Sequence, residues 1–448
     1  MTAPDKPLHQ PVLDLIASKG VLIGIIGMGY VGLPLAVAFG GVGIRVLGFD
    51  VDPRKAEALN AGESYIKHIA DNQVSALKSA GMLEATSDMD RLGEPDALLI
   101  CVPTPLTRHL EPDLSYVVST VEAIAKRLRP GQIVILESTT YPGTTSEVMQ
   151  PILERSGLKV GTDFFIAYSP EREDPGNLDF STSRIPKVVG ADDSASREIA
   201  DAIYSTFVPR TVQVSSAATA EAVKITENVF RAVNIALVNE LKVVFHAMDI
   251  NVWEVIEAAK TKPFGYMPFY PGPGLGGHCI PIDPFYLTWK AREYSQHTRF
   301  IELAGQINSS MPNHVVAQLA LALDLRASKG LNGARILVSG LAYKKNIDDI
   351  RESPSLALIE LLEQRGAEVT YHDPYVPEIP MTREHEALAG RRSWDWNPDG
   401  LNDFDAVLIA TDHDSIDYVT LAKRARIVVD TRNACARAGA PLDAVVLA

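Results

Sequence analysis

Residues 21–52 read VLIGIIGMGYVGLPLAVAFGGVGIRVLGFDVD, and this stretch decides the fold of the first part of the chain. An apolar run at 21–26 leads into the glycine-rich turn GMGYVG at 27–32, and a helical stretch and a second apolar run ending at Asp50 follow. A strand, a GxGxxG turn, a helix and a terminal acid in this order are typical of a dinucleotide-binding βαβ unit. The stretch therefore predicts a parallel α/β sheet that binds a dinucleotide.

Each glycine of the turn has its own expected role. Gly27 permits the tight turn, Gly29 lets the backbone approach a pyrophosphate, and Gly32 lets the helix pack close to the strand. The pyrophosphate is expected at the helix N-terminus, where unpaired N–H groups and the helix dipole favour an anion. Asp50 is placed to accept hydrogen bonds from the adenosine ribose and to repel a 2′-phosphate, so NAD is favoured over NADP. A merely flexible turn is the alternative, and the complete context favours the cofactor site.

The alternating pattern continues in DALLICVPTP (96–105) and QIVILESTTYPGTT (132–145), two apolar strands that end in small polar residues and proline. Ligands of open parallel sheets bind at the carboxyl ends of the strands, so the hydroxyls here either contact a ligand or form ordinary turns. The residues that we expect to bind the cofactor are Gly27, Gly29, Tyr30, Val31, Gly32, Asp50, Arg54, Thr104, Ser138 and Thr139.

A second α/β pattern lies near the other end of the chain. Residues 334–374 again read as strand, turn, helix and strand, and DAVLIATDH and RIVVDTRN mirror DALLICVPT and QIVILESTT. This turn lacks GxGxxG and offers Lys344, Lys345 and Arg351, which suits a nucleotide phosphate bound by side-chain charge. A solvated basic face is the alternative interpretation.

The region between the two patterns is predicted to be helical. Residues 217–248 contain neither glycine nor proline, so one long helix is expected, with Lys224 and Asn228 on one face. A second helical stretch is expected at roughly 286–328, interrupted at Pro312. We therefore predict two Rossmann-like doubly wound domains joined by a central helical domain, a connector that commonly forms a subunit interface. The expected boundaries are 1–209 for the N-terminal domain, with 1–20 as an extension, 210–328 for the central domain and 329–448 for the C-terminal domain.

Composition limits the possible partners. The net charge of −14 argues against a surface that attracts nucleic acid or anionic membrane, and no stretch has the apolar length of a membrane span. Residues 1–20 lack the features of a secretory signal, so we expect a cytoplasmic protein. Three widely spaced cysteines, Cys101, Cys279 and Cys435, form neither a disulfide framework nor a zinc pattern, and no metal is expected.

One of these cysteines lies in the stretch PGPGLGGHCIPIDP, residues 271–284. Simple alcohol oxidation needs no thiol, but Cys279 is useful when the product aldehyde is itself oxidised, because a thiohemiacetal can lose a second hydride and water can release a carboxylate from the resulting thioester. A nearby lysine lowers the pKa of such a thiol, and the preceding glycines let substrate come close. Cys101 reads as a small buried hydrophobe, and His278 is too close in sequence to aim its ring at Cys279. The pattern predicts a four-electron oxidation.

The ordered set GMGYVGLP, STTYPGTT, SPERED, the helix with Lys224 and Asn228, GGHCIPID and YKKNIDDIRESP covers nearly the whole chain. It resembles the UDP-glucose/GDP-mannose dehydrogenase family, the nucleotide-sugar 6-dehydrogenases. The resemblance implies an NAD-binding N-terminal domain, a central helical domain that forms a homodimer, and a C-terminal domain that holds the UDP moiety.

The resemblance also implies roles at the reacting centre. Cys279 matches the nucleophile, and Lys224 and Asn228 match the groups that stabilise the oxyanion. Asp283 matches a residue that assists water and proton transfer. The remaining matches are Glu171 as the acid that activates the hydrolytic water, Thr139 as a helper at the reacting centre, and Glu171, Lys224, Asn228, Tyr270, Gly274, Gly276, Lys344 and Arg351 as residues that contact substrate or an interface.

Departures from the family bear on the sugar. The UDP-glucose branch typically reads CLPKD where this chain has CIPID, its second acid has no clean counterpart in PEREDPG, and only Lys262 lies near its substrate arginine. Residues 261–293 instead resemble the UDP-N-acetylglucosamine branch, which makes a uronic acid for surface polysaccharides. We therefore expect UDP-N-acetyl-D-glucosamine as the substrate, with UDP-glucose and UDP-N-acetyl-D-mannosamine as alternatives.

Two interpretations from other classes stay open. One is a single-step β-hydroxyacid dehydrogenase of similar domain order, which needs no cysteine and releases two electrons. The other is a catalytically silent protein that only binds a nucleotide sugar. The presence of Cys279, Lys224, Asn228 and Asp283 together argues against the silent protein.

Overall fold

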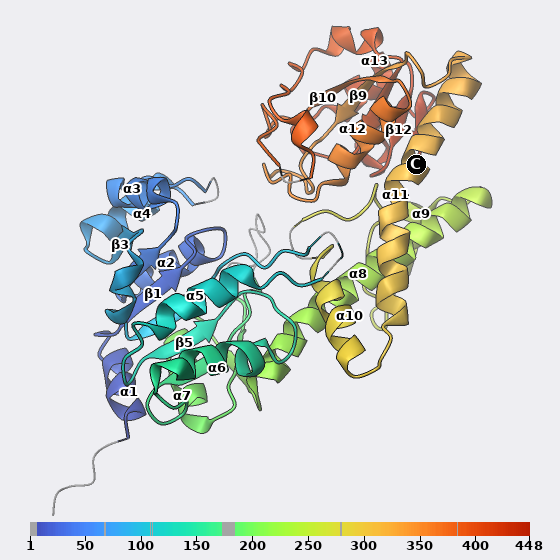
Figure 1. Cartoon of the computed structure of the whole chain (residues 1–448). Coiled ribbons are helices and arrows are strands. Elements are labelled where there is room, and N and C mark those ends of the chain that lie inside the picture. Colours follow the sequence, from blue (N-terminus) through green and yellow to red (C-terminus); the bar gives the residue numbers. More distant parts are fainter. Residues whose placement is uncertain are drawn as a thin grey trace, which may run out of the picture. The chain divides into compact units, whose positions relative to one another are not determined.

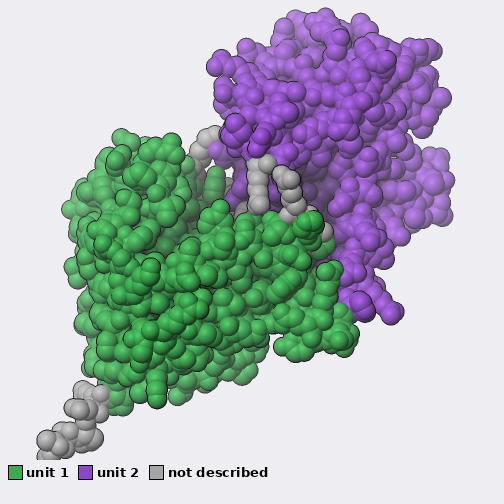
Figure 2. Space-filling model, in the orientation of Figure 1, with its two compact units in different colours: residues 1–227, 285–296 green, residues 228–284, 297–448 purple. Residues whose placement is uncertain are grey.

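The computed structural model describes residues 7–66, 69–107, 109, 111–172, 184–277, 280–382 and 384–448. These residues divide into two compact units, shown in Figure 2. Unit 1 comprises residues 1–227 and 285–296, and unit 2 comprises residues 228–284 and 297–448. Each unit is described by itself below.

Unit 1 is built on one sheet with the strand order β3-β2-β1-β4-β5-β6-β7-β8 among its described residues. Neighbouring strands are parallel except β6 and β7, which run antiparallel. The order steps outward from β1 in both directions, as expected for a doubly wound sheet. The strands are β1 (Leu22–Ile26), β2 (Arg45–Phe49), β3 (Leu83–Thr86), β4 (Ala97–Ile100), β5 (Ile133–Leu136), β6 (Phe165–Tyr168), β7 (Lys187–Gly190) and β8 (Thr211–Val214).

Helices cover both faces of this sheet (Figure 1). Alternate residues of β5 point to opposite faces, so Ile133 and Ile135 join one apolar core while Val134 and Leu136 join the other. The first core is closed by α1 (His9–Ala17), α2 (Gly32–Gly41), α3 (Pro53–Ala61), α4 (Asp71–Ser79) and α7 (Ser194–Tyr204), and the second by α5 (Ser115–Ala125), η2 (Thr144–Met149) and α6 (Gln150–Leu153). Such double burial explains the nearly continuous apolar runs of these strands.

Unit 2 contains a smaller parallel sheet with the order β10-β9-β11-β12-β13 in the part that is described. Its strands are β9 (Arg335–Ser339), β10 (Glu368–His372), β11 (Ala406–Ile409), β12 (Val428–Asp430) and β13 (Val445–Leu447). One face packs on α11 (Arg299–Ala327) and α12 (Pro354–Gln364), and the other packs on α13 (Tyr418–Arg424) and α14 (Ala434–Arg437). The second α/β pattern of the sequence is therefore confirmed.

The long helix expected at 217–248 is present as α8 (Ala217–Ala247), and α9 (Val252–Ala259) follows it. The second helical stretch was placed correctly but its break was not. The break lies at 294–298, between α10 (Asp283–Glu293) and α11, where the amides of 294–296 bond back to the carbonyls of Ala291 and Arg292 and Ser295 has a φ of +54°. Pro312 lies inside α11, which continues through it although proline lacks the N–H for one helical hydrogen bond.

No helix among the described residues is both long and apolar enough to cross a membrane.

Candidate active site

The glycine-rich turn after β1 has room for a ligand at one position only. Gly27 has a φ of +93°, and a Cβ there would lie 2.6 Å from the carbonyl oxygen of Cys101. A Cβ at Gly32 would overlap the Gly27 carbonyl, so this glycine lets α2 begin against the turn. A Cβ at Gly29, in contrast, would meet no atom within 4 Å. Gly27 and Gly32 thus serve the fold, and Gly29 leaves the space that a pyrophosphate needs.

Asp50 is held beside this turn. Its side chain is 5% exposed and accepts the N–H of Met28 at 3.0 Å and the N–H of Asp52 at 3.0 Å. The ammonium of Lys55 lies 2.9 Å from the same carboxylate. The carboxylate is therefore fixed where the sequence places the ribose hydroxyls of the cofactor, and the residues fit an NAD site. Arg54, also expected to contact the cofactor, is exposed and pairs with Asp52.

The strand ends bring the expected hydroxyl residues to one edge of the sheet. β4 and β5 are parallel neighbours, so Thr104, Ser138 and Thr139 follow strands that end side by side. The Ser138 hydroxyl donates to the Val102 carbonyl at 2.7 Å, which ties the two strand ends together. The carbonyl of Thr104 accepts the hydroxyl of Tyr286 at 2.9 Å. Polar groups of Thr104 and Ser138 therefore stabilise this edge of the sheet through hydrogen bonds within the protein.

Glu171 follows β6 at this same edge and is largely buried. Its carboxylate lies 3.1 Å from the ammonium of Lys187, which also binds Glu137 at 2.7 Å. Sequence reasoning did not find this cluster, although a lysine opening the apolar strand KVVG was a signal for it. Cys101 lies nearby, and burial together with the charge of Glu137 raises the pKa of its thiol well above the usual value. That supports the interpretation of Cys101 as an unreactive thiol.

In unit 2 the stretch PGPGLGG is fixed by two buried side chains, Asn239 and Lys242, and a third, Asn308, holds Asn239. The N–H of Gly272 donates to the Asn239 side chain at 3.0 Å, and the Gly272 carbonyl accepts the ammonium of Lys242 at 3.2 Å. Asn239 in turn donates to Asn308 at 2.9 Å, and Asn308 donates to the carbonyl of Ala232 at 3.1 Å. The side chains of Asn239, Lys242 and Asn308 are all buried. The loop is therefore attached to α8 and α11 through hydrogen bonds that water does not reach.

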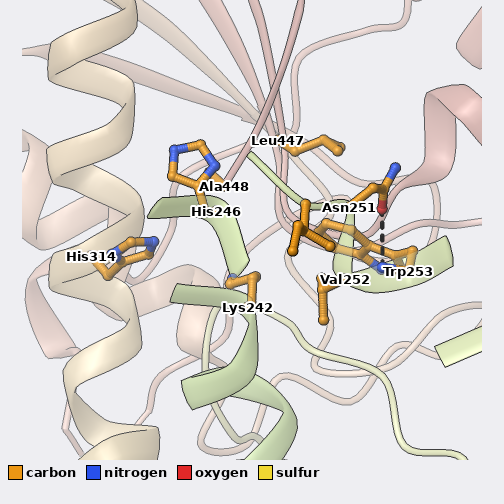
Figure 3. A pocket seen from close by; sticks show the side chains of 9 residues that line it. Lys242, His246, Asn251, Val252, Trp253, His314, Leu447 and Ala448 are labelled. Atoms are coloured by element: carbon orange, nitrogen blue, oxygen red, sulfur yellow. Dashed lines mark hydrogen bonds between the residues drawn. The ribbon is translucent and has the colours of Figure 1, made fainter. Parts of the chain in front are cut away.

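Burial at this position disfavours the charged form of Lys242. Burial, together with the charge of Arg432, lowers the pKa of Lys242 to about 7. The side chain borders a small cavity of about 30 Å³ that His246, Trp253 and His314 also line (Figure 3). Burial of this lysine is costly, and its hydrogen bond to the Gly272 carbonyl offsets part of that cost.

The glycines at the end of the loop pack against the C-terminal α/β pattern. A Cβ at Gly276 would lie 2.6 Å from the Cβ of Tyr343, and a Cβ at Gly277 would lie 3.0 Å from the same ring. The N–H of Gly277 donates to the Arg351 carbonyl at 3.1 Å. The guanidinium of Arg351 pairs with Asp349 at 2.6 Å. Arg351, expected to contact substrate, thus also holds the loop through its backbone.

The predicted nucleophile, Cys279, and its neighbour His278 lie outside the described residues. Described residues on either side of them carry the remaining contacts of the loop. Asp283 opens α10 and accepts the side-chain N–H of Asn228 at 2.5 Å, and both side chains are buried. Lys224 lies one turn before Asn228 on α8 and is also buried, at 9% exposure. The predicted face of α8 therefore does look inward.

A larger cavity in unit 2, of about 580 Å³, was not predicted. Arg432, Asn433 and Arg437 line it together with Tyr270. Burial lowers the pKa of Arg432, whose guanidinium donates to the Ala410 carbonyl at 3.0 Å. The signal in the sequence was the arginine that ends RIVVDTR, two residues after the last residue of β12.

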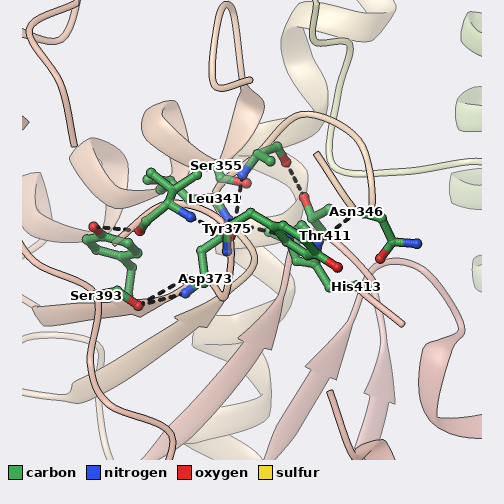
Figure 4. A network of polar contacts seen from close by, with 12 residues as sticks. Leu341, Asn346, Ser355, Asp373, Tyr375, Ser393, Thr411 and His413 are labelled. Carbon is green, nitrogen blue, oxygen red and sulfur yellow. Dashed lines mark hydrogen bonds and ion pairs between the residues drawn. The ribbon is translucent and has the colours of Figure 1, made fainter. Parts of the chain in front are cut away.

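The turn after β9 is closed by a polar network (Figure 4). Asp373 accepts the N–H groups of Leu341 and Ala342 and the ring N–H of His413 at 3.0 Å. Lys345 pairs with Asp414 on the neighbouring loop at 3.1 Å. Lys344 and Lys345, which are expected to bind phosphate, therefore extend from a turn in which backbone N–H groups already donate to Asp373.

Comparison with known proteins places this geometry in a family. Residues 21–208 match the NAD binding domain of the UDP-glucose/GDP-mannose dehydrogenase family, residues 218–310 match its central domain, and residues 337–437 match its UDP binding domain. The chain belongs to the UDP-glucose/GDP-mannose dehydrogenase family. It is an NAD-dependent nucleotide-sugar 6-dehydrogenase with the three-domain architecture of that family.

Individual relatives of this dehydrogenase differ in the sugar that their names give. The UDP-N-acetyl-D-glucosamine 6-dehydrogenase of Pseudomonas aeruginosa is 39% identical over 369 residues, which are 82% of this chain and 86% of that protein. The UDP-N-acetyl-D-mannosamine dehydrogenase of Pyrococcus horikoshii is 35% identical over 92% of this chain and 95% of that protein. The structure of the Pyrococcus horikoshii UDP-D-ManNAc dehydrogenase matches with a TM-score of 0.83 at 35% identity, covering 92% of this chain and 96% of that one.

Proposed function

We propose that this dehydrogenase oxidises the C6 hydroxyl of a UDP-sugar to the carboxylate, a four-electron reaction, with Cys279 as the nucleophile. The observation that carries the proposal is the anchoring of the loop on both sides of Cys279. On one side Gly277 is bound to the Arg351 carbonyl, and on the other Asp283 is bound to Asn228. A reactive side chain needs such fixed neighbours if it is to meet one carbon atom of a bound sugar.

The chain's own residues divide the chemistry among them. NAD, when bound, supplies the hydride acceptor for both oxidations. The Cys279 thiolate adds to the C6 aldehyde, and the Lys224 ammonium and Asn228 amide stabilise the oxyanion that forms. Loss of a hydride from this carbon leaves a thioester. Water then attacks the thioester carbon, the C–S bond breaks, and the water proton passes to Glu171, with Asp283 and Thr139 assisting proton transfer and positioning.

For the substrate we propose UDP-N-acetyl-D-glucosamine, whose product serves surface polysaccharide biosynthesis. The similarity to the Pseudomonas aeruginosa UDP-N-acetyl-D-glucosamine 6-dehydrogenase and the motif differences from the UDP-glucose branch support this choice. UDP-N-acetyl-D-mannosamine is the second candidate, because the Pyrococcus horikoshii relative matches a larger share of the chain. A site built for an acetamido group leaves polar groups unpaired when UDP-glucose binds, which predicts a preference of about a hundredfold or more in kcat/KM.

We further propose that the cavity at Tyr270, Arg432 and Arg437 receives part of the UDP moiety. Its volume of about 580 Å³ is sufficient for a ligand of this kind. Asp412 and Glu257 also line it and Arg437 pairs with Asp412, so Arg432 is the guanidinium that we propose for the phosphate oxygens. Lys344 and Arg351 add positive charge in the same unit. Gly274 and Gly276 stay proposed substrate contacts of the loop.

A homodimer through the central helices is supported by the surface of α8. Phe230, Leu237 and Val244 are 46% exposed or more and recur seven residues apart, which places them along one face of α8, and the exposed Met248 directly follows the helix. An apolar stripe of this kind on a long helix suits a second copy of the chain. The three domains are proposed to span 1–209, 210–328 and 329–448, with the middle one carrying this interface.

The proposal is tested by measuring kcat/KM for UDP-N-acetylglucosamine, UDP-N-acetylmannosamine and UDP-glucose with the wild type and with Cys279→Ala. We expect the highest value for UDP-N-acetylglucosamine and no uronate from the variant. Cys101→Ser is the matched control, because its buried thiol has no proposed role, and it should keep its activity. Full turnover by Cys279→Ala would refute the thioester mechanism, and comparable turnover of either other sugar would refute the substrate assignment.

A further inference from the structure

Unit 1 buries a lysine between two carboxylates at the edge where β4, β5 and β6 end. Glu137 follows β5, Glu171 follows β6, and Lys187 opens β7. The Lys187 ammonium lies 2.7 Å from Glu137 and 3.1 Å from Glu171, and its side chain is only 3% exposed. Glu137 is fully buried and Glu171 is 13% exposed. A buried charge of this kind is costly unless it is paired, so the arrangement calls for a reason.

The antiparallel pairing of β6 and β7 explains how the lysine reaches this edge. Tyr168, the last residue of β6, pairs with Gly190, and continuing this antiparallel register past the end of β6 sets each later residue opposite one that is a position earlier in β7. Glu171 comes three residues after Tyr168 and Lys187 three residues before Gly190, so the two side chains fall opposite one another. A seventh strand parallel to β6 would have placed its first residue at the other end of the sheet.

We infer that Lys187 is a positioning residue that holds the Glu171 carboxylate in place and ionised, so that Glu171 can take a proton from the water that cleaves the thioester. This inference rests on the proposed function, in which Glu171 activates that water. Lys187 is itself bound from behind by Glu137, which fixes its ammonium. Glu137 is fixed in turn by the Tyr204 hydroxyl, which donates to it at 2.5 Å.

The surroundings of the cluster support this division of roles. Burial raises the pKa of Glu137, and the charge and hydrogen bond of Lys187 oppose the rise. Burial lowers the pKa of Lys187, but Glu137 and Glu171 outweigh it and raise the value to about 12, so the lysine stays charged. A permanent positive charge thus faces Glu171.

The other polar and titratable groups around the cluster do not substitute for the Lys187 ammonium beside Glu171. The N–H of Arg172 donates to Glu171 at 2.7 Å, while the guanidinium of Arg172 pairs with Glu227 of α8 at 2.6 Å. Tyr204 comes from α7 and Cys101 from the end of β4, and the pKa of each is raised well above its usual value, chiefly by burial. Both are therefore neutral at physiological pH.

The test compares Lys187→Met with Glu137→Gln in the full-length enzyme. Both changes break the same buried ion pair, but only the first removes the positive charge from Glu171. For Lys187→Met we expect the acid limb of the pH profile of kcat to move up by about 1–3 pH units, the usual effect of losing a nearby opposite charge. At pH 7 the variant should release a burst of NADH and then turn over slowly, with KM for the UDP-sugar little changed. In Glu137→Gln the acid limb should not rise, and Lys187→Arg should restore it to near the wild-type position.

If Lys187→Met does not fold, the double variant Lys187→Met with Glu137→Gln removes both charges of the fully buried pair, and it gives the same comparison because Glu171 again lacks the lysine. An equal upward move of the limb in Glu137→Gln, or an unmoved limb in the variants that lack Lys187, would overturn the inference. Glu171→Gln separates it from the proposed function. Slow hydrolysis at every pH in that variant supports the role of Glu171, and full turnover would overturn both that role and the inference. One NADH per sugar in the wild type would refute the two-step chemistry itself.

Discussion

The two α/β units repeat the same turn and use it differently. In unit 1, Gly27 has a φ of +93° and donates its N–H to the carbonyl of Phe49 at 2.8 Å. In unit 2, Gly340 has a φ of +90° and donates its N–H to the carbonyl of His372 at 2.8 Å. In both units the glycine follows the first strand, and its acceptor is the last residue of the next strand. The backbone frame of a dinucleotide site is therefore present twice.

The aspartates that directly follow these acceptor residues, Asp50 and Asp373, differ in the number of N–H groups that they accept from the turn. Asp50 accepts one N–H from the glycine-rich turn after β1, that of Met28. Asp373 accepts two, one of them from Ala342, and also the ring N–H of His413 (Figure 4). The carbonyl of Ala342 is bound as well, by a threonine hydroxyl after β11. In unit 2 the protein's own side chains fill the place that unit 1 leaves to a ligand.

This difference shows that the turn alone does not make a nucleotide site. At the second glycine of the fingerprint, unit 1 has Gly29 with open space around it, whereas unit 2 has Ala342 with both backbone groups bound. Unit 2 therefore needs side-chain charge to bind a nucleotide, which agrees with its match to a UDP binding domain and with the arginines around its cavity.

The largest expected difference between the units is the effect of an alanine substitution in each turn. In Gly340→Ala the new Cβ would collide with the Thr411 carbonyl at a positive φ, so the free energy of unfolding should fall by about 2–4 kcal/mol. In Gly29→Ala there is space for the Cβ, so stability should change by less than about 1 kcal/mol while NAD binding weakens. Urea unfolding and NAD titration measure both quantities. A Gly29→Ala protein that loses as much stability as Gly340→Ala, or that binds NAD as tightly as the wild type, would contradict the open space at Gly29.

A second comparison exchanges the acids for amides. Asp373→Asn puts an N–H₂ group against donors that now face a carboxylate, so we expect a loss of about 2–3 kcal/mol in the free energy of unfolding. Asp50→Asn should keep the fold and weaken NAD by about 1–3 kcal/mol, because a charge-assisted bond to the ribose is lost. Calorimetric binding and thermal unfolding distinguish the two outcomes. Equal use of NAD and NADP by the wild type would contradict the role of Asp50.

A third and smaller test is how the free energy of unfolding falls at acid pH. Burial raises the pKa of Asp373, but the hydrogen bond and charge of His413 and the backbone N–H groups outweigh it and lower the pKa below its usual value. A carboxyl with a lowered pKa contributes stability that is present above the unfolded value of about 3.9 and lost as the pH falls through the folded value. His413→Gln should therefore flatten the loss of stability below pH 4, by less than about 1.4 kcal/mol per pH unit. An unchanged slope would contradict the proposed coupling.

The smallest expected effect lies at the open turn. Lys55 is 36% exposed and pairs with Asp50, so its ion pair is screened by solvent. Lys55→Met should change the free energy of unfolding by less than about 1 kcal/mol, and the NAD preference over NADP should persist. A large loss of NAD affinity would show that Lys55, and not only Asp50, determines the cofactor site.

The sequence predicted the strands, the first turn and α8 because their signals are local. Apolar runs, a GxGxxG turn and a helix without glycine or proline each lie within about thirty residues. The break after α10 was placed wrongly because Pro312 is a strong local signal that this helix tolerates, while the actual break depends on Ser295, which carries no such signal.

The supports of the site could not be predicted because they join distant parts of the chain. Lys187 meets Glu137 across fifty residues, and Asn239 meets Asn308 across sixty-nine. A single sequence contains no periodic pattern for such pairs, since their encounter depends on sheet order and helix packing. Helix spacing singled out Asn228, and the family resemblance implied the catalytic roles of Asn228 and Asp283, but their hydrogen bond is seen in the structure alone.

The most direct test of the proposed chemistry is the number of NADH molecules formed for each UDP-N-acetylglucosamine consumed, followed to completion with excess NAD and the product identified by mass spectrometry. Oxidation of a hydroxyl through a thioester to a carboxylate removes two hydrides, so we predict a ratio of two and a uronate product. A ratio of one, with an aldehyde or ketone as product, would contradict the four-electron mechanism and favour a single-step dehydrogenase.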